Sequence, residues 1–266
     1  MEAGQDNGAS APLAYAADVA NGLADVLGDA LAGAYLHGSA VLGGWTAIRS
    51  DVDVLVVLAD RVGDGQIGAA GAVLLAAAAQ APGRGLECSA VTVSAAADPG
   101  PPWPFVLHLA RRDGRADLVT GRGHPGDPDL LMHYAVATAA GVALAGPEPG
   151  ALIGAVPRHL ILEYLAGELS WGLAHASEAY AVLNACRALA YLRDGAIVAK
   201  VAGGRAALSR GWGPARTVGS ALDQQLGRLP ERPPGRAAAE FVVRTAAELR
   251  AAAAGQAAGP RASPPA

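Results

Sequence analysis

The sequence predicts an α/β (α+β) domain with a mixed sheet, followed by an all-α helical bundle. Short β-branched runs alternate with Ala-rich helical segments over the first 156 residues. One of these runs, Val54-Leu55-Val56-Val57-Leu58, has the apolar character of a buried central strand. From about Pro157 the sequence keeps helical periodicity and loses all strand signals. We therefore expect two domains with a cleft between them, residues 1–156 and 157–254, and a disordered tail at 255–266.

The elements of the first domain follow in order. Apolar residues at helical spacing predict a helix over residues 13–32, which Gly33 ends. After it we expect strands at 34–37, 52–58 and 86–93, an edge strand at 105–109, helices at 66–81 and 130–137, a loop at 110–128 and a short segment at 141–147. In the second domain the periodicity predicts helices at 158–175, 178–193, 198–210 and 236–253. Gly and Pro residues separate these helices.

Composition excludes several classes of protein. The mean hydropathy of +0.27 is high, but no apolar run reaches the roughly 18 residues of a membrane span. The N-terminal residues lack the features of a secretory signal. The two cysteines, Cys88 and Cys186, are too few for a disulfide framework and indicate a reducing compartment. A net charge of −4 does not favour nucleic acid and is compatible with a cationic small substrate. We expect a cytoplasmic protein with neither nucleic-acid nor membrane partners.

The chemistry is concentrated in a strand–turn–strand region, where Gly38-Ser39 follows one strand and Asp51-Val52-Asp53 opens the next. Carboxylates two residues apart on a strand point to the same face, and holding both there is costly without a cation between them. The Gly-Ser turn offers N–H groups and a hydroxyl to phosphate oxygens. Each feature alone is commonly a solvated acid pair or an ordinary turn. Together they predict metal-dependent chemistry on a nucleoside triphosphate, with Ser50 as a further candidate in the connecting segment.

A third carboxylate, Glu87, stands near the start of a neighbouring strand. It could ligate metal beside Asp51 and Asp53, or accept a proton from a substrate hydroxyl. The alternative is a surface glutamate at a strand edge. The histidines show no metal-ligand spacing, and we expect His37 to pack beside or cap the Gly-Ser turn.

The Gly38-Ser39 and Asp51-x-Asp53 pattern resembles the nucleotidyltransferases of the DNA polymerase β superfamily. Over residues 13–253 the chain is similar to the aminoglycoside 3″/9-adenylyltransferases of the streptomycin/spectinomycin type. A second motif carries this likeness, Tyr180-Ala181-Val182-Leu183-Asn184-Ala185-Cys186-Arg187 followed by Gly195-x-Ile197-x-x-Lys200. The resemblance implies that Arg187 and Lys200 bind the ATP phosphates and that Glu87 is the catalytic base. It further implies ATP and Mg²⁺ as cofactors and AMP transfer to a hydroxyl of an aminoglycoside-like small molecule.

The acceptor half of the family pattern is not retained. The acidic drug-binding positions fall near Leu173 and Ser177, so we name Trp103, His175 and Glu178 as candidate substrate contacts. Polycationic drugs pair with carboxylates, and this chain offers fewer of them than the family pattern. A different acceptor, either another metabolite or a protein side chain, is therefore an alternative, as is a non-catalytic nucleotide- or drug-binding relative. We expect a monomer.

Overall fold

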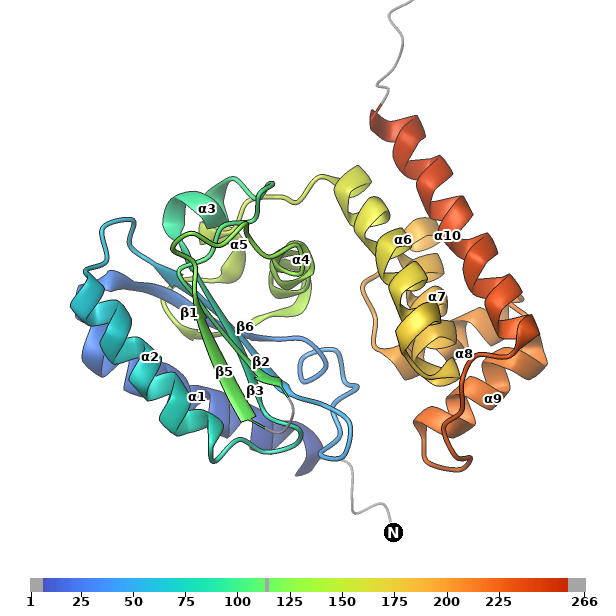
Figure 1. Ribbon diagram of the computed structural model, residues 1–266, viewed down its shortest axis with the longest axis horizontal. Helices are drawn as coiled ribbons and strands as arrows, with labels where there is room; N and C mark the ends of the chain where they lie inside the picture. Colours follow the sequence, from blue (N-terminus) through green and yellow to red (C-terminus); the bar gives the residue numbers. More distant parts are fainter. Residues whose placement is uncertain (1–6, 113–114, 258–266) are drawn as a thin grey trace, which may run out of the picture. The chain divides into compact units, whose positions relative to one another are not determined.

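The computed structural model describes residues 7–112 and 115–257. The chain divides into two compact units, Met1–Val156 and Pro157–Ala266, and Figure 1 labels most of their helices and strands. The first unit combines a sheet with helices and the second is helical, so the predicted fold class is confirmed. No helix among the described residues combines the length and apolar character needed to cross a membrane.

The sheet of the first unit has six strands in the order β5-β4-β3-β2-β1-β6. Its strands are β1 Leu31–His37, β2 Val52–Leu58, β3 Leu86–Thr92, β4 Leu107–Arg112, β5 Arg115–Thr120 and β6 Val142–Ala145. Only β2 and β3 run parallel, and the other neighbours are antiparallel, which makes the sheet mixed as predicted.

Two expectations about this sheet are wrong, and a third becomes more specific. The predicted edge strand at 105–109 is the interior strand β4, because β5 pairs with its outer side. The predicted loop at 110–128 contains β5, whose polar residues suit an edge. The short segment at 141–147 contains the opposite edge strand, β6.

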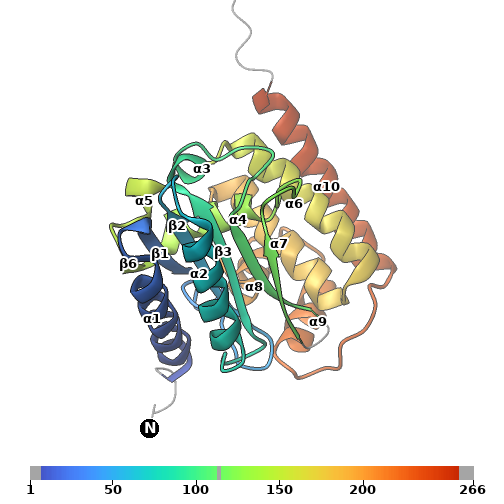
Figure 2. The same ribbon diagram turned by 60° about the vertical axis from the view of Figure 1, so that its left-hand side comes forward.

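The helices of the first unit are α1 Asn7–Leu27, α2 Asp64–Ala78, α3 Val93–Ala97, α4 Leu130–Ala140 and α5 Pro149–Leu152, with a 3₁₀ turn at Gly28–Ala30. Figures 1 and 2 show α1 and α2 side by side along one face of the sheet. The alternation of strand side chains then decides which residues this pair covers. Even-numbered residues of β1–β3, such as Leu36, Val54 and Cys88, form a core with α1 and α2.

The odd-numbered residues of β1, β2 and β3 occupy the other face. There α4 packs against β1 and β2. The buried residues of this face include Tyr35, Leu55, Val57 and Val91. At one end of the same three strands the alternation places His37, Asp53 and Glu87. The alternation that directs apolar side chains into the core on one face thus places these polar residues on the face covered by α4.

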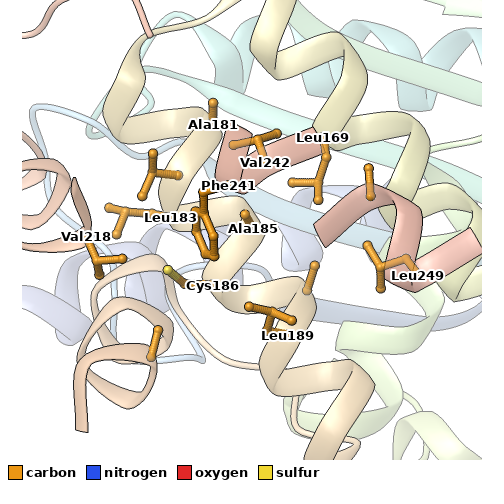
Figure 3. Close-up of a cluster of buried hydrophobic side chains, with 14 of the residues drawn as sticks. Leu169, Ala181, Leu183, Ala185, Cys186, Leu189, Val218, Phe241, Val242 and Leu249 are labelled. Atoms are coloured by element: carbon orange, nitrogen blue, oxygen red, sulfur yellow. The ribbon is translucent and has the colours of Figure 1, made fainter. Parts of the chain in front are cut away.

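The second unit consists of α6 Arg158–His175, α7 Glu178–Asp194, α8 Lys200–Arg210, α9 Ala215–Gln225 and α10 Arg236–Ala257. Residues from all five helices, including Leu169, Leu183, Val218 and Phe241, form one buried core, part of which is shown in Figure 3. Helix α7 supplies more of this cluster than any other helix. Ser177 caps its N-terminus, and the Ser177 hydroxyl accepts a hydrogen bond from Tyr180 N.

Two expectations for the second unit need correction. Helix α9 was not predicted, because Thr217, Gly219 and Ser220 are weak helix formers and only one narrow side of the segment is buried. Helix α10 continues to Ala257, beyond the expected start of a tail at 255. Residues 258–266 lie outside the described part of the chain.

Candidate active site

Three polar residues lie in register across the first unit. His37 on β1 pairs with Asp53 on β2, and Asp53 pairs with Glu87 on β3. Cross-strand partners point to the same face with their Cβ atoms roughly 5 Å apart. The structure therefore brings together two of the three predicted carboxylates, and Asp51 precedes them at the entrance to β2.

The Gly38-Ser39 turn packs directly against Asp53. Gly38 has φ +69°, and a Cβ atom at this position would overlap Asp53 Oδ2. The Ser39 backbone N–H donates a hydrogen bond to the Asp53 carboxylate. Two further bonds close the turn, from Leu42 N to Gly38 O at 3.3 Å and from Gly44 N to Ser39 O at 2.9 Å. The predicted turn and the predicted carboxylate are thus one local structure.

Ser50 shapes the segment that leads into Asp51. Its Oγ accepts a hydrogen bond from Thr46 N at 3.1 Å, and its carbonyl accepts one from Arg84 N at 2.9 Å. Trp45 Nε1 donates to the Asp51 carbonyl at 3.0 Å. These contacts tie Ser50 to the loop that leads into Asp51.

The adjacent carboxylates perturb one another. Burial raises the pKa of Asp53 to about 7, and the negative charges of Glu87 and Asp51 add to this rise. Burial also raises the pKa of Glu87, but the hydrogen bond and positive charge of His133 outweigh burial and lower it to about 2. Asp53 therefore carries the cost of two neighbouring anions, a cost that a cation would remove.

The donor set fits a divalent cation by its chemistry, because Mg²⁺ prefers carboxylate oxygens. Asp51, Asp53 and Glu87 are the residues that would hold it. Over residues 7–112 and 115–257, no three His, Cys, Asp or Glu side chains are gathered closely enough to hold a metal ion together. Glu87 is instead directed to a histidine.

That histidine, His133 on α4, is the residue that sequence reasoning missed. Its Nε2 lies 3.4 Å from Glu87 Oε1, and its ring centroid lies 4.8 Å from that of His37. Burial lowers the pKa of His133, but the hydrogen bond and charge of Glu87 outweigh burial and raise it to about 9. Burial and the neighbouring His133 lower the pKa of His37. The one signal in the sequence is a histidine inside an apolar helical run.

The second unit brings Arg187 and Lys200 together. Arg187 Nε donates to Val198 O at 2.8 Å, close to the start of α8 at Lys200. Arg187 Nη1 donates to Asn184 Oδ1 at 3.2 Å. Lys200 Nζ lies 4.5 Å from the centre of the Tyr180 ring. Tyr180, Asn184 and Arg187 share one side of α7 by their spacing, and α8 adds the lysine to it.

Of the three candidate substrate contacts, the structure leaves one exposed. Glu178 is 3% exposed, and its carboxylate accepts hydrogen bonds from Gln224, Arg232 and the Gly235 N–H. Trp103 is 7% exposed in the first unit. These placements do not fit direct substrate contact, because the side chains are already enclosed by the protein.

His175 is the exposed candidate. It stacks on Trp171 with ring centroids 5.4 Å apart. It also borders a surface hollow of about 600 Å³ within the second unit, whose lining includes Leu173, Ser177 and Arg232. The two positions that the family fills with acids thus face the same hollow as His175.

Comparisons with known proteins point in one direction. Residues 152–228 match the family described as "Aminoglycoside adenylyltransferase, C-terminal domain". The fold matches the crystal structure of spectinomycin adenyltransferase AAD(9) from Enterococcus faecialis with ATP and spectinomycin, at a TM-score of 0.60 and 16% sequence identity. This match covers 91% of the present chain and 98% of that chain. Curated protein sequences give no match. The predicted likeness to aminoglycoside adenylyltransferases is therefore confirmed.

Proposed function

We propose that this aminoglycoside adenylyltransferase-like protein is a cytoplasmic nucleotidyltransferase that transfers AMP from ATP to a hydroxyl of an aminoglycoside-like small molecule, releasing pyrophosphate. One observation carries the proposal. Asp53 and Glu87 lie side by side on paired strands, and the Gly38-Ser39 turn packs against Asp53. The matched family and the AAD(9) structure, which was solved with ATP and spectinomycin, support the same chemistry.

The reaction needs positioning and charge compensation more than covalent help from the protein. The acceptor hydroxyl oxygen attacks the α-phosphorus of ATP. The bond from that phosphorus to the oxygen bridging to the β-phosphate breaks, and pyrophosphate leaves with the electron pair. The hydroxyl proton passes to the carboxylate of Glu87, which is ionised at neutral pH because its pKa is lowered.

The remaining roles follow from the donors and charges present. When bound, Mg²⁺ supplies Lewis-acid neutralisation of the phosphoryl oxygens, and Asp51, Asp53 and Glu87 would hold it. The Ser39 hydroxyl and the turn at Gly38 receive phosphate oxygens. Arg187 and Lys200 supply positive charge to the triphosphate.

Replacing Asp53 by Asn tests the proposal. The substitution is nearly isosteric, and the amide oxygen can still accept the hydrogen bond from Ser39 N. It also removes the repulsion between Asp53 and Glu87, so we expect thermal stability to be unchanged or higher. We expect pyrophosphate release to fall at least about a thousandfold, because metal ligation supplies several kcal/mol to such reactions. Asp25→Asn on the exposed part of α1 is the matched control. Unchanged turnover in Asp53→Asn would refute the assignment.

A second candidate keeps the chemistry and changes the acceptor. Leu173 and Ser177 bring no charge to the hollow, Arg232 pairs with Glu178, and Glu168 accepts a hydrogen bond from the Tyr180 hydroxyl. A polycation would therefore find few carboxylates in this region, where Glu231 is the one acid in the lining of the hollow. Mass spectrometry of products after incubation with ATP, Mg²⁺ and spectinomycin, streptomycin or unrelated polyols separates the two candidates. Turnover with a polyol alone favours the second.

The third candidate is a relative that binds nucleotide or drug without catalysis. Retention of Asp53 and Glu87 as an adjacent pair argues against it, because binding alone does not need a buried carboxylate held beside another. Calorimetry decides the point. Tight binding of ATP with Mg²⁺ and no product from any acceptor would favour this reading.

A further inference from the structure

We propose that His133 is a positioning residue for Glu87, holding its carboxylate in the orientation in which it accepts the proton of the acceptor hydroxyl. The inference rests on the proposed function of Glu87 as the base. Nothing in the family pattern named above includes His133. The contact that carries the inference is the 3.4 Å approach of His133 Nε2 to Glu87 Oε1.

The two partners differ in their access to solvent. The His133 side chain is 13% exposed and the Glu87 side chain 30% exposed. Helix α4 is anchored beside His133 by the fully buried Leu130 and Tyr134. The carboxylate can therefore meet a substrate while the imidazole stays behind it. This arrangement makes His133 act through Glu87 and not on the substrate itself.

The imidazole of His133 contacts the Glu87 carboxylate and packs against the His37 ring. Its Nδ1 is buried without a hydrogen-bond partner among the described residues, so the hydrogen-bonding capacity of the ring is directed to Glu87. The His37 ring lies against it at 4.8 Å with an interplanar angle of 44°. His37 is itself 3% exposed and stands across from Asp53. His37, on strand β1, thus helps to hold the His133 ring in the position from which it contacts Glu87.

Stability alone does not account for this histidine. Burying the His133 ring with its unpartnered Nδ1 costs free energy, and an apolar pair in place of His133 and Glu87 would avoid that cost. Glu87 could be partly hydrated without its partner, given its exposure. An alignment role explains why a polar group is kept here, since a carboxylate that rotates freely spends less time in the reactive geometry.

Two substitutions at one position separate alignment from packing. His133→Met keeps the length and removes the donor, whereas His133→Gln places an amide N–H near the position of Nε2. Turnover is measured with ATP, Mg²⁺ and spectinomycin, or with the acceptor that the panel above identifies. For His133→Met we expect kcat to fall roughly 10–100-fold, as for other groups that orient a catalytic residue, with KM for ATP within about twofold. We expect His133→Gln to restore most of kcat. Thermal stability should fall in both variants, because the Glu87 carboxylate loses its charged partner, so it is the recovery of kcat in His133→Gln that identifies the alignment role.

The double variant with Glu87→Gln completes the test. If His133 acts through Glu87, adding His133→Met to Glu87→Gln causes no further loss. His124→Met, a replacement of an exposed histidine of the same unit, controls for the substitution itself. Wild-type turnover in His133→Met, multiplicative losses in the double variant, or failure of Gln to restore kcat each overturn the inference. If Glu87→Gln instead turns over like the wild type, the proposed function of Glu87 fails first and this inference fails with it.

Discussion

At the scale of single residues, close packing against Asp53 decides which amino acid can stand at position 38. Gly38 has a positive φ and lies against the Asp53 carboxylate, so both backbone and space exclude a side chain. Gly43 has the same φ of +69° but nothing within 4 Å of its would-be Cβ atom. Substitutions at these two glycines therefore distinguish the cost of backbone strain from the cost of steric overlap.

Alanine substitutions at these glycines should have different effects. Gly43→Ala introduces only the strain of a positive φ at a residue with a side chain. We expect it to lower the free energy of unfolding by about 1–2 kcal/mol and to retain activity. Gly38→Ala adds overlap with Asp53. We expect it to lower the free energy of unfolding by roughly 2–5 kcal/mol and to abolish adenylyl transfer. Denaturant unfolding and a turnover assay on both variants check this. Equal effects of the two substitutions would contradict the close packing of turn and carboxylate.

Glu178 provides a prediction about pH. Burial raises the pKa of its carboxyl, but hydrogen bonds from Arg232, Gly235 and Gln224 outweigh burial and hold the pKa below the ordinary value of 4.5. A carboxylate with a lowered pKa in the folded state stabilises the protein above that ordinary value and loses this contribution as pH falls through the folded value. We expect Glu178→Gln to cost about 2–3 kcal/mol at pH 7.

The pH dependence distinguishes this effect from simple packing. The stability difference between wild type and Glu178→Gln should be constant from pH 7 to about 5 and shrink below pH 4.5. Thermal unfolding across that range measures it. Glu240→Gln, at an exposed ion pair of α10, is the control and should change stability little at any pH. A difference for Glu178→Gln that persists unchanged into acid would contradict the network.

The residue scale also shows what sequence could predict about the site. Asp53 and Glu87 were predictable, because each opens a strongly apolar strand and alternation fixes its face. His133 was not, since its contact with Glu87 depends on where α4 packs over the sheet, and no local pattern encodes that placement. Glu178 was misjudged because a glutamate near the start of a helix looks solvated until the distant Arg232 is brought to it.

At the scale of elements, the close packing of α8 against α7 depends on Gly203, which has no side chain. A Cβ atom on Gly203 would meet Arg187 Cγ at 3.0 Å and the Arg187 backbone N at 3.1 Å. The helix backbone cannot yield as a side chain can. Gly219 in α9 has open space around its would-be Cβ atom. These glycines differ in what they do for the fold, although both lie inside helices.

We expect opposite signs when each is replaced by alanine. Gly219→Ala should stabilise the protein by about 0.5–1 kcal/mol through helix propensity. Gly203→Ala should be net destabilising by about 1–2 kcal/mol, because overpacking against α7 exceeds that gain. It should also weaken ATP binding by displacing Arg187 relative to Lys200. Chemical denaturation and ATP titration measure both effects. Stabilisation by Gly203→Ala with unchanged ATP affinity would show that α8 need not approach α7 so closely.

Elements with a strong pattern were predicted and weak ones were not. Strand β2 and helix α6 match their expected ranges, 52–58 and 158–175, since apolar runs with clear boundaries specify them. The edge strands β5 and β6 were missed, because an edge strand buries little and its polar residues resemble a loop. Helix α9 was missed for a similar reason, as the buried side of the segment is narrow.

At the scale of the whole molecule, the two units have separate cores. The core of the first unit combines strands β1–β4 with α1 and α2. That of the second unit is formed by helices alone, with Leu183 and Phe241 among its fully buried members. A unit that buries its own core can fold alone. The proposed roles, however, are divided between the units, with the carboxylates in the first and the phosphate-binding cations in the second.

Cutting the chain between Val156 and Pro157 should therefore separate folding from function. We expect the fragment 157–257 to be helical by circular dichroism and to unfold cooperatively, and the fragment 1–156 to fold with its sheet intact. Neither fragment should transfer AMP. In the full chain, Arg187→Met with Lys200→Met should weaken ATP binding. Thermal stability should fall as well, since the hydrogen bonds from Arg187 to Val198 O and Asn184 Oδ1 are lost with the two charges. Transfer by fragment 1–156 at the full-length rate would remove the second unit from the chemistry. If both fragments are inactive but the double variant is active, the second unit is still required for the reaction. Its role would then belong to residues other than Arg187 and Lys200.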